Sequence, residues 1–153
     1  MVKTKILIVD DEEAIREVVS TLLEALGYEC MSVSNGRLAK EFLIQHPVDI
    51  VLSDMMMPEM NGLSLVEWLR KAEPDVPIIM VTAVHELGTA LDAIRRGAYD
   101  YILKPFEKDQ LYMSVRRALE HRRLVLENQK YQSNLEKLVE ERTAQLQGAL
   151  EQL

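Results

Sequence analysis

The sequence has one cysteine, five prolines and six glycines among its 153 residues, and aromatic side chains make up only 5% of it. A single cysteine cannot form a disulfide within the chain, and the apolar context of Cys30 predicts a buried, unreactive thiol. No apolar run approaches the roughly 18 residues that a membrane span needs, and the N-terminus lacks the apolar stretch of a signal peptide. We therefore expect a soluble cytoplasmic protein with no membrane contact.

Positive charge is also scarce, because 18 Lys and Arg face 25 Asp and Glu, which gives a formal charge of -7. This balance argues against broad affinity for nucleic acids or anionic membranes, which both reward an excess of basic side chains. Four arginines gather around His121, at positions 116, 117, 122 and 123, but acidic neighbours surround them and no second helical unit follows. We expect no direct binding to DNA.

Apolar residues make up 48% of the chain, enough for a core, and up to about residue 106 short apolar runs alternate with amphipathic stretches of helical spacing. The runs are Ile6 to Val9, Tyr28 to Val33, Ile50 to Leu52, Ile78 to Val81 and Tyr101 to Leu103. Parallel strands need crossover connections, so the alternation predicts an α/β fold. We expect a five-stranded parallel sheet of order 2-1-3-4-5 in a flavodoxin-like three-layer sandwich.

Three amphipathic stretches each place their apolar residues on one helix face, which we expect to bear on the sheet. These residues are Ile15, Val18, Leu22 and Leu26 in the first stretch, Leu65, Val66 and Leu69 in another, and Leu87, Leu91 and Ile94 in a later one. The second apolar run contains Glu29 and Ser32, and Ser34 follows it, as is typical of an edge strand.

Acidic residues stand where two of the apolar runs stop. Asp10 and Asp11 follow the first run and Asp54 closes the third. In a sheet of this order the carboxyl ends of these strands meet at the switch point, so three carboxylates would crowd together. They need a cation, a raised pKa or plentiful water. A hard divalent metal is the simplest solution.

Thr82 and Lys104 follow the fourth and fifth runs at the same sheet edge. Alone, such a threonine usually caps a turn and such a lysine reaches into solvent. Beside three carboxylates they complete the set that phosphoryl transfer requires. Asp54 can attack phosphorus, Mg²⁺ can neutralise charge on the phosphoryl oxygens, and Lys104 and Thr82 can donate hydrogen bonds to them.

Four segments in order, each at a predicted strand end, resemble the receiver domain of bacterial two-component response regulators. They are Ile8-Val9-Asp10-Asp11-Glu12, Leu52-Ser53-Asp54-Met55-Met56-Met57-Pro58-Glu59-Met60-Asn61-Gly62, Val81-Thr82-Ala83 and Asp100-Tyr101-Ile102-Leu103-Lys104-Pro105-Phe106. The resemblance covers residues 4 to about 122. We therefore assign residues 1–122 to a receiver, or phosphoacceptor, domain and residues 123–153 to a helical coiled-coil linker.

The resemblance implies a phosphorelay role in which Asp54 accepts a phosphoryl group from a phosphohistidine on a sensor histidine kinase. It further implies that Asp11, Asp54 and the backbone carbonyl of Met56 ligate Mg²⁺, with Mn²⁺ as a substitute, and that Asp10 acts on the metal mainly through water. In this family the positions of Met56 and Val84 influence hydrolysis of the phosphoaspartate, and their apolar side chains predict a long-lived phosphoryl group. Such a domain is no enzyme beyond its own phosphorylation and dephosphorylation.

The remaining motif residues have implied roles in the response to phosphorylation. Lys104 binds one phosphoryl oxygen, and Thr82 turns inward to donate to another. Tyr101 follows Thr82 from an exposed to a buried rotamer, and Ala83 leaves room for the phosphoryl group. The resemblance also implies a cis bond between Lys104 and Pro105.

The segment from about Glu107 to Leu153 has no proline and one glycine, and it is rich in good helix formers. Its apolar stripe narrows to a heptad seam, which predicts a parallel homodimeric coiled coil rather than a lone solvated helix. The seam consists of Leu124, Asn128, Tyr131, Leu135, Leu138 and Arg142, with Leu146, Leu150 and Leu153 after a stutter. An amide in the seam, at Asn128, can fix register and partner number.

Two questions stay open from the residues. A metal-dependent phosphatase with an aspartyl nucleophile would pair Asp10 with Glu12, but the chain has no insertion large enough to cap a substrate. The tail from Asn134 to Leu146 resembles linkers that lead to an output domain, either an HD-type cyclic-di-GMP phosphodiesterase, which we favour narrowly, or a histidine kinase.

Overall fold

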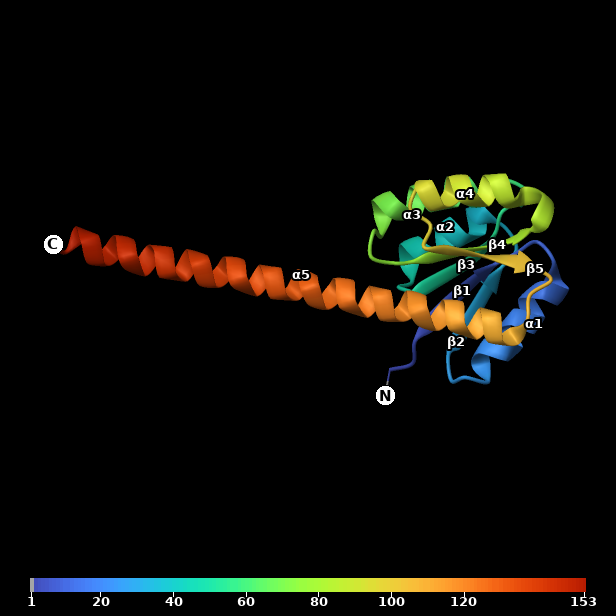
Figure 1. Ribbon diagram of the computed structural model, residues 1–153, viewed down its shortest axis with the longest axis horizontal. Coiled ribbons are helices and arrows are strands. Elements are labelled where there is room, and N and C mark those ends of the chain that lie inside the picture. Colours follow the sequence, from blue (N-terminus) through green and yellow to red (C-terminus); the bar gives the residue numbers. More distant parts are fainter. Residues whose placement is uncertain (1) are drawn as a thin grey trace. The chain divides into compact units, whose positions relative to one another are not determined.

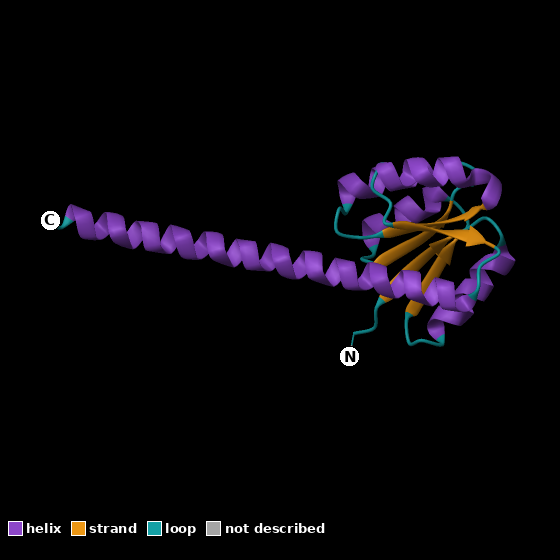
Figure 2. Ribbon diagram, viewed as in Figure 1, coloured by secondary structure: helices purple, strands orange, loops and turns teal. Residues whose placement is uncertain are grey.

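A computed structural model of the chain describes residues 2–153, although the side chain of Val84, which entered the prediction of phosphoryl lifetime, lies outside the described part. Five parallel strands form one sheet of order β2-β1-β3-β4-β5. The strands are β1 (Lys5–Val9), β2 (Glu29–Val33), β3 (Ile50–Asp54), β4 (Ile78–Ala83) and β5 (Asp100–Lys104). The helices are α1 (Glu13–Glu24), α2 (Gly36–Gln45), α3 (Gly62–Ala72), α4 (Leu87–Arg95) and α5 (Lys108–Glu151), with the 3-10 turn η1 (Val84–Glu86) before α4. Figure 2 shows the alternation of strand and helix that the sequence predicts.

Helices cover both faces of the sheet, so the predicted three-layer sandwich is confirmed (Figure 1). Leu7, Val9 and Val51 point to one face and pack with α2, α3 and α4. Their neighbours in the strands, such as Ile8 and Leu52, point to the other face and pack with α1 and the first turns of α5. Both faces of β1 and β3 are buried, as expected of central parallel strands, and β2 is an edge strand as predicted.

The predicted apolar face of the first helix is confirmed in part, because Ile15 and Leu22 pack against the core. The buried residues of α1 are Val19 and Leu23, whereas Val18 is 52% exposed and Leu26 is 40% exposed. Leu26 also lies beyond the end of α1, because Gly27 follows with a φ of 92° that glycine adopts without strain. The spacing of large apolar residues therefore located the helix, but it did not identify Val19 and Leu23 as its most buried residues.

The prediction for the fourth helix is also confirmed only in part: Ile94 packs against the core, but Leu91 is 42% exposed and the buried residues are Ala90 and Ala93. Alanine lets a helix backbone approach the sheet closely, and a pattern of large side chains overlooks it. For α3 the prediction is confirmed, because Leu65 and Leu69 are fully buried.

Cys30 is half-buried in β2 rather than buried. Burial, reinforced by the nearby charge of Glu24, raises the pKa of its thiol to about 11. The thiol is therefore protonated near neutral pH, as an unreactive cysteine should be.

The chain divides into two compact units, residues 1–122 and residues 123–153. In the first unit, α5 buries Leu111, Val115 and Ala118, while every residue of the second unit is exposed or half-buried. Among residues 2–153, no helix is long and apolar enough to cross a membrane.

Candidate functional site

The carboxyl ends of three strands bring Asp10, Asp54 and Lys104 to one edge of the sheet. Asp54 is the last residue of β3 and Lys104 the last residue of β5, and Asp10 directly follows β1. The parallel register aligns these ends, since Val9 pairs with Ser53, Asp54 with Val81 and Ala83 with Lys104.

Two buried carboxylates share one ammonium group at this edge. Lys104 Nζ lies 3.2 Å from Asp10 Oδ2 and 3.5 Å from Asp54 Oδ1. Asp10 is 2% exposed and Asp54 is 7% exposed. The Asp54 Oδ1 atom also accepts a hydrogen bond of 2.8 Å from the backbone N–H of Met55, which orients the carboxylate.

The negative charge of Asp54 is only partly offset by Lys104 and the Met55 N–H. Burial, together with the charge of Asp10, raises the pKa of Asp54 to about 6, although Lys104 and the Met55 N–H oppose the shift. Burial alone would lower the pKa of Lys104, but the charges of Asp54 and Asp10 outweigh it and raise that pKa. The site is therefore deficient in positive charge and suited to a further cation.

Asp10, Asp11 and Glu12 form a group whose carboxylate oxygens lie within 4.8 Å of one another. Asp11 and Glu12 are exposed, and the Glu12 N–H donates to Asp10 Oδ1 at 2.9 Å. Oxygen donors of this kind match the preference of Mg²⁺, which keeps several waters and takes few carboxylates. The sequence predicted Asp10 and Asp11 as ligands but gave Glu12 no part in metal binding.

The loop after β3 is held against Asp54 by close packing. Gly62 donates its N–H to the Met55 carbonyl at 2.9 Å, and a Cβ at position 62 would come within 2.6 Å of the Asp54 carbonyl oxygen. Glu59 has a φ of 68° and accepts a hydrogen bond of 2.7 Å from Arg37 Nε on α2. The Met56 side chain points out of this loop and is 59% exposed.

The predicted switch residues lie along β4 and β5. Thr82 is fully buried, and its hydroxyl lies 3.1 Å from Glu86 Oε2 and 3.4 Å from the Ala83 carbonyl oxygen. Tyr101 is half-buried, and the bond between Lys104 and the following proline is cis, as the resemblance implied. The sequence did not predict the contact between Thr82 and Glu86, because nothing in the local pattern around Glu86 distinguishes it from a solvated glutamate.

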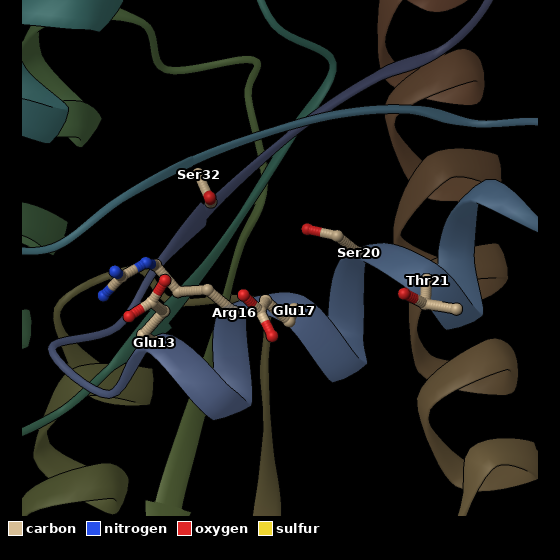
Figure 3. A pocket seen from close by; sticks show the side chains of 6 residues that line it. All are labelled: Glu13, Arg16, Glu17, Ser20, Thr21 and Ser32. Carbon is tan, nitrogen blue, oxygen red and sulfur yellow. The ribbon is translucent and has the colours of Figure 1, made fainter.

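A surface hollow of about 420 Å³ lies beside this cluster, between α1 and the end of β2. Figure 3 shows its lining side chains, which are Glu13, Arg16, Glu17, Ser20, Thr21 and Ser32. Arg16 connects the hollow to the carboxylate cluster, because its Nη1 atom donates to the Asp10 carbonyl oxygen at 2.7 Å. The residues that are described as lining the hollow are all charged or hydroxyl-bearing.

The sequence is similar to a known protein family and to several of its members. Residues 6–116 match the family model of the response regulator receiver domain. The regulatory protein AtoC of Escherichia coli is 42% identical over 116 residues, which cover 76% of this chain and 25% of AtoC. The chain thus spans about a quarter of that relative's length.

The fold is also similar to that of solved structures. NtrX from Brucella abortus superposes with a TM-score of 0.80 at 34% identity, over 84% of this chain and 29% of that protein. The signal receiver domain of an HD domain-containing protein from Pseudomonas fluorescens superposes with a TM-score of 0.76 at 30% identity, over 80% of this chain and 98% of that domain.

Proposed function

Because this chain belongs to the response regulator receiver family, we propose that Asp54 accepts a phosphoryl group from a phosphohistidine of a sensor histidine kinase. The observation that carries the proposal is the cluster of Asp54, Asp10 and Lys104, in which a buried carboxylate at a strand end lies 3.5 Å from an ammonium group. Transfer is in line: a carboxylate oxygen of Asp54 forms a bond to phosphorus while the bond from phosphorus to the histidine nitrogen breaks, and its electron pair stays on the imidazole.

The residues of the cluster have distinct parts in this reaction. Asp54 must be ionised to attack, and with a pKa of about 6 it is mostly ionised at neutral pH. Lys104 already lies between the two carboxylates, so its ammonium group can donate to a phosphoryl oxygen bound to Asp54 without a large movement. Thr82 supplies a second donor after rotation of its hydroxyl, and Ala83 offers little steric hindrance.

Mg²⁺ is the cofactor that this donor set fits, with Mn²⁺ as a substitute. Asp11, Asp54 and the Met56 backbone carbonyl would hold it, and Asp10 would contact it through water. The bound ion supplies positive charge that neutralises the phosphoryl oxygens. The group formed by Asp10, Asp11 and Glu12, and the raised pKa of Asp54, support this assignment.

The proposal is tested by phosphorylation with radiolabelled acetyl phosphate in the presence of Mg²⁺. We expect the parent to take up one phosphoryl group per chain and Asp54→Asn to take up none, while Asp92→Asn, on exposed α4, behaves as the parent does. Equal labelling of Asp54→Asn and the parent would refute the assignment. Turnover of small phosphomonoesters that is lost in Asp10→Asn but kept in Asp54→Asn would favour the phosphatase alternative.

We further propose that residues 123–153 form a parallel homodimeric coiled coil that relays the change to an output module. Support comes from exposed apolar residues along the seam: Leu124 is 51% exposed, Tyr131 64%, Leu135 42% and Leu138 53%. Asn128 lies in the same seam. Because α5 runs uninterrupted from Lys108 to Glu151, a small rotation of its first turns would be transmitted along the helix.

Sedimentation equilibrium tests the coil. We expect the parent to be a dimer at micromolar concentration, the double variant Leu135→Glu, Leu138→Glu to be a monomer, and Ser133→Glu, outside the seam, to remain a dimer. A monomeric parent at high micromolar concentration would refute the pairing.

For the output module we propose an HD-type cyclic-di-GMP phosphodiesterase. The similarity to the receiver of an HD domain-containing protein supports this choice, and the match to only a quarter of AtoC supports a longer whole protein. The coding sequence that follows residue 153 tests the choice directly, and a DNA-binding or kinase domain there would refute it.

A further inference from the structure

Glu86 lies four residues after Thr82, at the end of η1. Its carboxylate faces back toward β4, with Oε2 3.1 Å from Thr82 Oγ1, and its side chain is only 18% exposed. Glu86 also occupies the N-cap position of α4, yet its side chain makes no capping hydrogen bond to that helix. The carboxylate therefore bonds the Thr82 hydroxyl instead of the first turn of its own helix.

We propose that Glu86 is a positioning residue that holds the Thr82 hydroxyl away from the phosphoryl site in the unphosphorylated protein. The inference rests on the proposed function, in which Asp54 is the phosphoacceptor. A hydroxyl has one proton and donates to one acceptor at a time. Glu86 Oε2, the Ala83 carbonyl oxygen at 3.4 Å and a phosphoryl oxygen on Asp54 compete for that proton.

The competition favours Glu86 until a stronger acceptor arrives. A hydrogen bond to a carboxylate is stronger than one to a neutral carbonyl, so Glu86 outcompetes Ala83 for the hydroxyl of Thr82. Thr82 is fully buried and cannot exchange this bond for one to water. Glu86 is partly exposed and has a second neighbour, since His85 Nε2 lies 3.6 Å from Oε1, so its carboxylate can be solvated when Thr82 leaves.

Removal of Glu86 should therefore release Thr82 and strengthen binding of a phosphoryl group. Beryllium fluoride with Mg²⁺ serves as the phosphoryl mimic, and isothermal titration calorimetry on the full chain gives its dissociation constant. We expect Glu86→Ala to bind the mimic about tenfold more tightly than the parent, the effect of one charge-assisted hydrogen bond. Glu86→Gln, which keeps an acceptor oxygen but loses the charge, should show a smaller gain.

A double-mutant cycle separates positioning from a simple charge effect. In a Thr82→Val background the same Glu86→Ala substitution should change the dissociation constant by less than about twofold. Asp92→Ala is the control, because it removes a carboxylate on α4 that pairs with Arg95. It should leave the dissociation constant of the mimic unchanged.

Each outcome decides the inference. Equal binding by Glu86→Ala and the parent would overturn it, and so would an equal gain in the Thr82→Val background, which would show a charge effect alone. If circular dichroism shows that Glu86→Ala is unfolded, Glu86→Gln is compared with the parent instead. A dissociation constant of Glu86→Gln equal to that of the parent would then overturn the inference. A parent that neither binds the mimic nor takes up label would overturn the proposed function, and this inference with it.

Discussion

The buried carboxylate of Asp54 should make the protein less stable than a variant without its charge. The pKa of Asp54 rises from 3.8 to about 6 on folding, because burial and Asp10 disfavour the charged form. One pKa unit corresponds to about 1.4 kcal/mol, so ionised Asp54 destabilises the folded state by about 3 kcal/mol. We expect Asp54→Asn to raise the free energy of unfolding by about that amount near pH 7, without divalent metal.

The raised pKa of Asp54 also predicts how the stability gain from Asp54→Asn depends on pH. Between pH 3.8 and about 6 the folded protein binds the Asp54 proton more tightly than the unfolded chain does, so stability falls as pH rises through this range. The gain from Asp54→Asn should therefore approach zero below about pH 4, reach roughly half its full value near pH 5, and level off above about pH 7. Asparagine keeps an oxygen that can accept the 2.8 Å hydrogen bond from Met55, so the substitution removes charge with little change in shape.

Urea denaturation followed by circular dichroism at several pH values measures this difference. Asp92→Asn is the matched control, because its carboxylate is exposed and pairs only weakly with Arg95, so it should change stability by less than about 0.5 kcal/mol at every pH. A neutral or destabilising effect of Asp54→Asn near pH 7 would refute the reasoning. A gain of constant size down to pH 4 would also refute it, since that would place the effect in packing and not in ionisation.

Three further outcomes follow from the loop and the carboxylates around the acceptor. Mg²⁺ should raise the melting temperature of the parent, with reversal by EDTA, and should raise it much less in Asp11→Asn, whereas equal shifts in a thermal scan would exclude Asp11 as a ligand. Glu59→Gly should raise the free energy of unfolding in urea by less than about 1 kcal/mol, because relief of the strained φ of 68° outweighs loss of the exposed ion pair with Arg37, and a loss of stability would contradict this. Gly62→Ala should lower the free energy of unfolding by about 2 kcal/mol or more, because the added Cβ would lie 2.6 Å from the Asp54 carbonyl oxygen. Gly88→Ala is the control and should not lower the free energy of unfolding, because no atom lies within 4 Å of a Cβ at position 88.

The strands and their parallel arrangement could be predicted because the apolar runs are short, turn residues separate them, and helical stretches connect them. The sheet edge then follows from parallel pairing, which brings Asp10, Asp54 and Lys104 together. Helix faces were less predictable. In α4 the buried residues Ala90 and Ala93 are small, and a pattern of large apolar residues gives them little weight.

Contacts between distant side chains could not be predicted, because they depend on how elements are placed in three dimensions. Arg122 belongs to a basic cluster in the sequence, yet its Nη1 atom pairs with Asp49 Oδ1 at 2.8 Å. Asp49 also accepts a hydrogen bond of 2.8 Å from the Lys5 backbone N–H through its other oxygen. This arginine therefore ties α5 to the start of the sheet, which is a structural role that its acidic and basic neighbours along the chain do not indicate.

Two features of the unphosphorylated site, the ionised carboxylate of Asp54 and the hydrogen bond between Thr82 and Glu86, would have different consequences in the proposed mechanism. The destabilisation from ionised Asp54 exists whichever way Thr82 points, so its relief strengthens binding of a cation or phosphoryl group but does not by itself favour one arrangement over another. The Thr82 hydroxyl, in contrast, bonds Glu86 in the resting protein and would bond the phosphoryl group in the modified one. Only such a difference in contacts can shift the conformational equilibrium, and a shift from 1:99 to 99:1 requires about 5.5 kcal/mol. One exchanged hydrogen bond would supply only part of a shift of that size, so in the proposed mechanism we expect Tyr101 and the packing of α4 to contribute the rest.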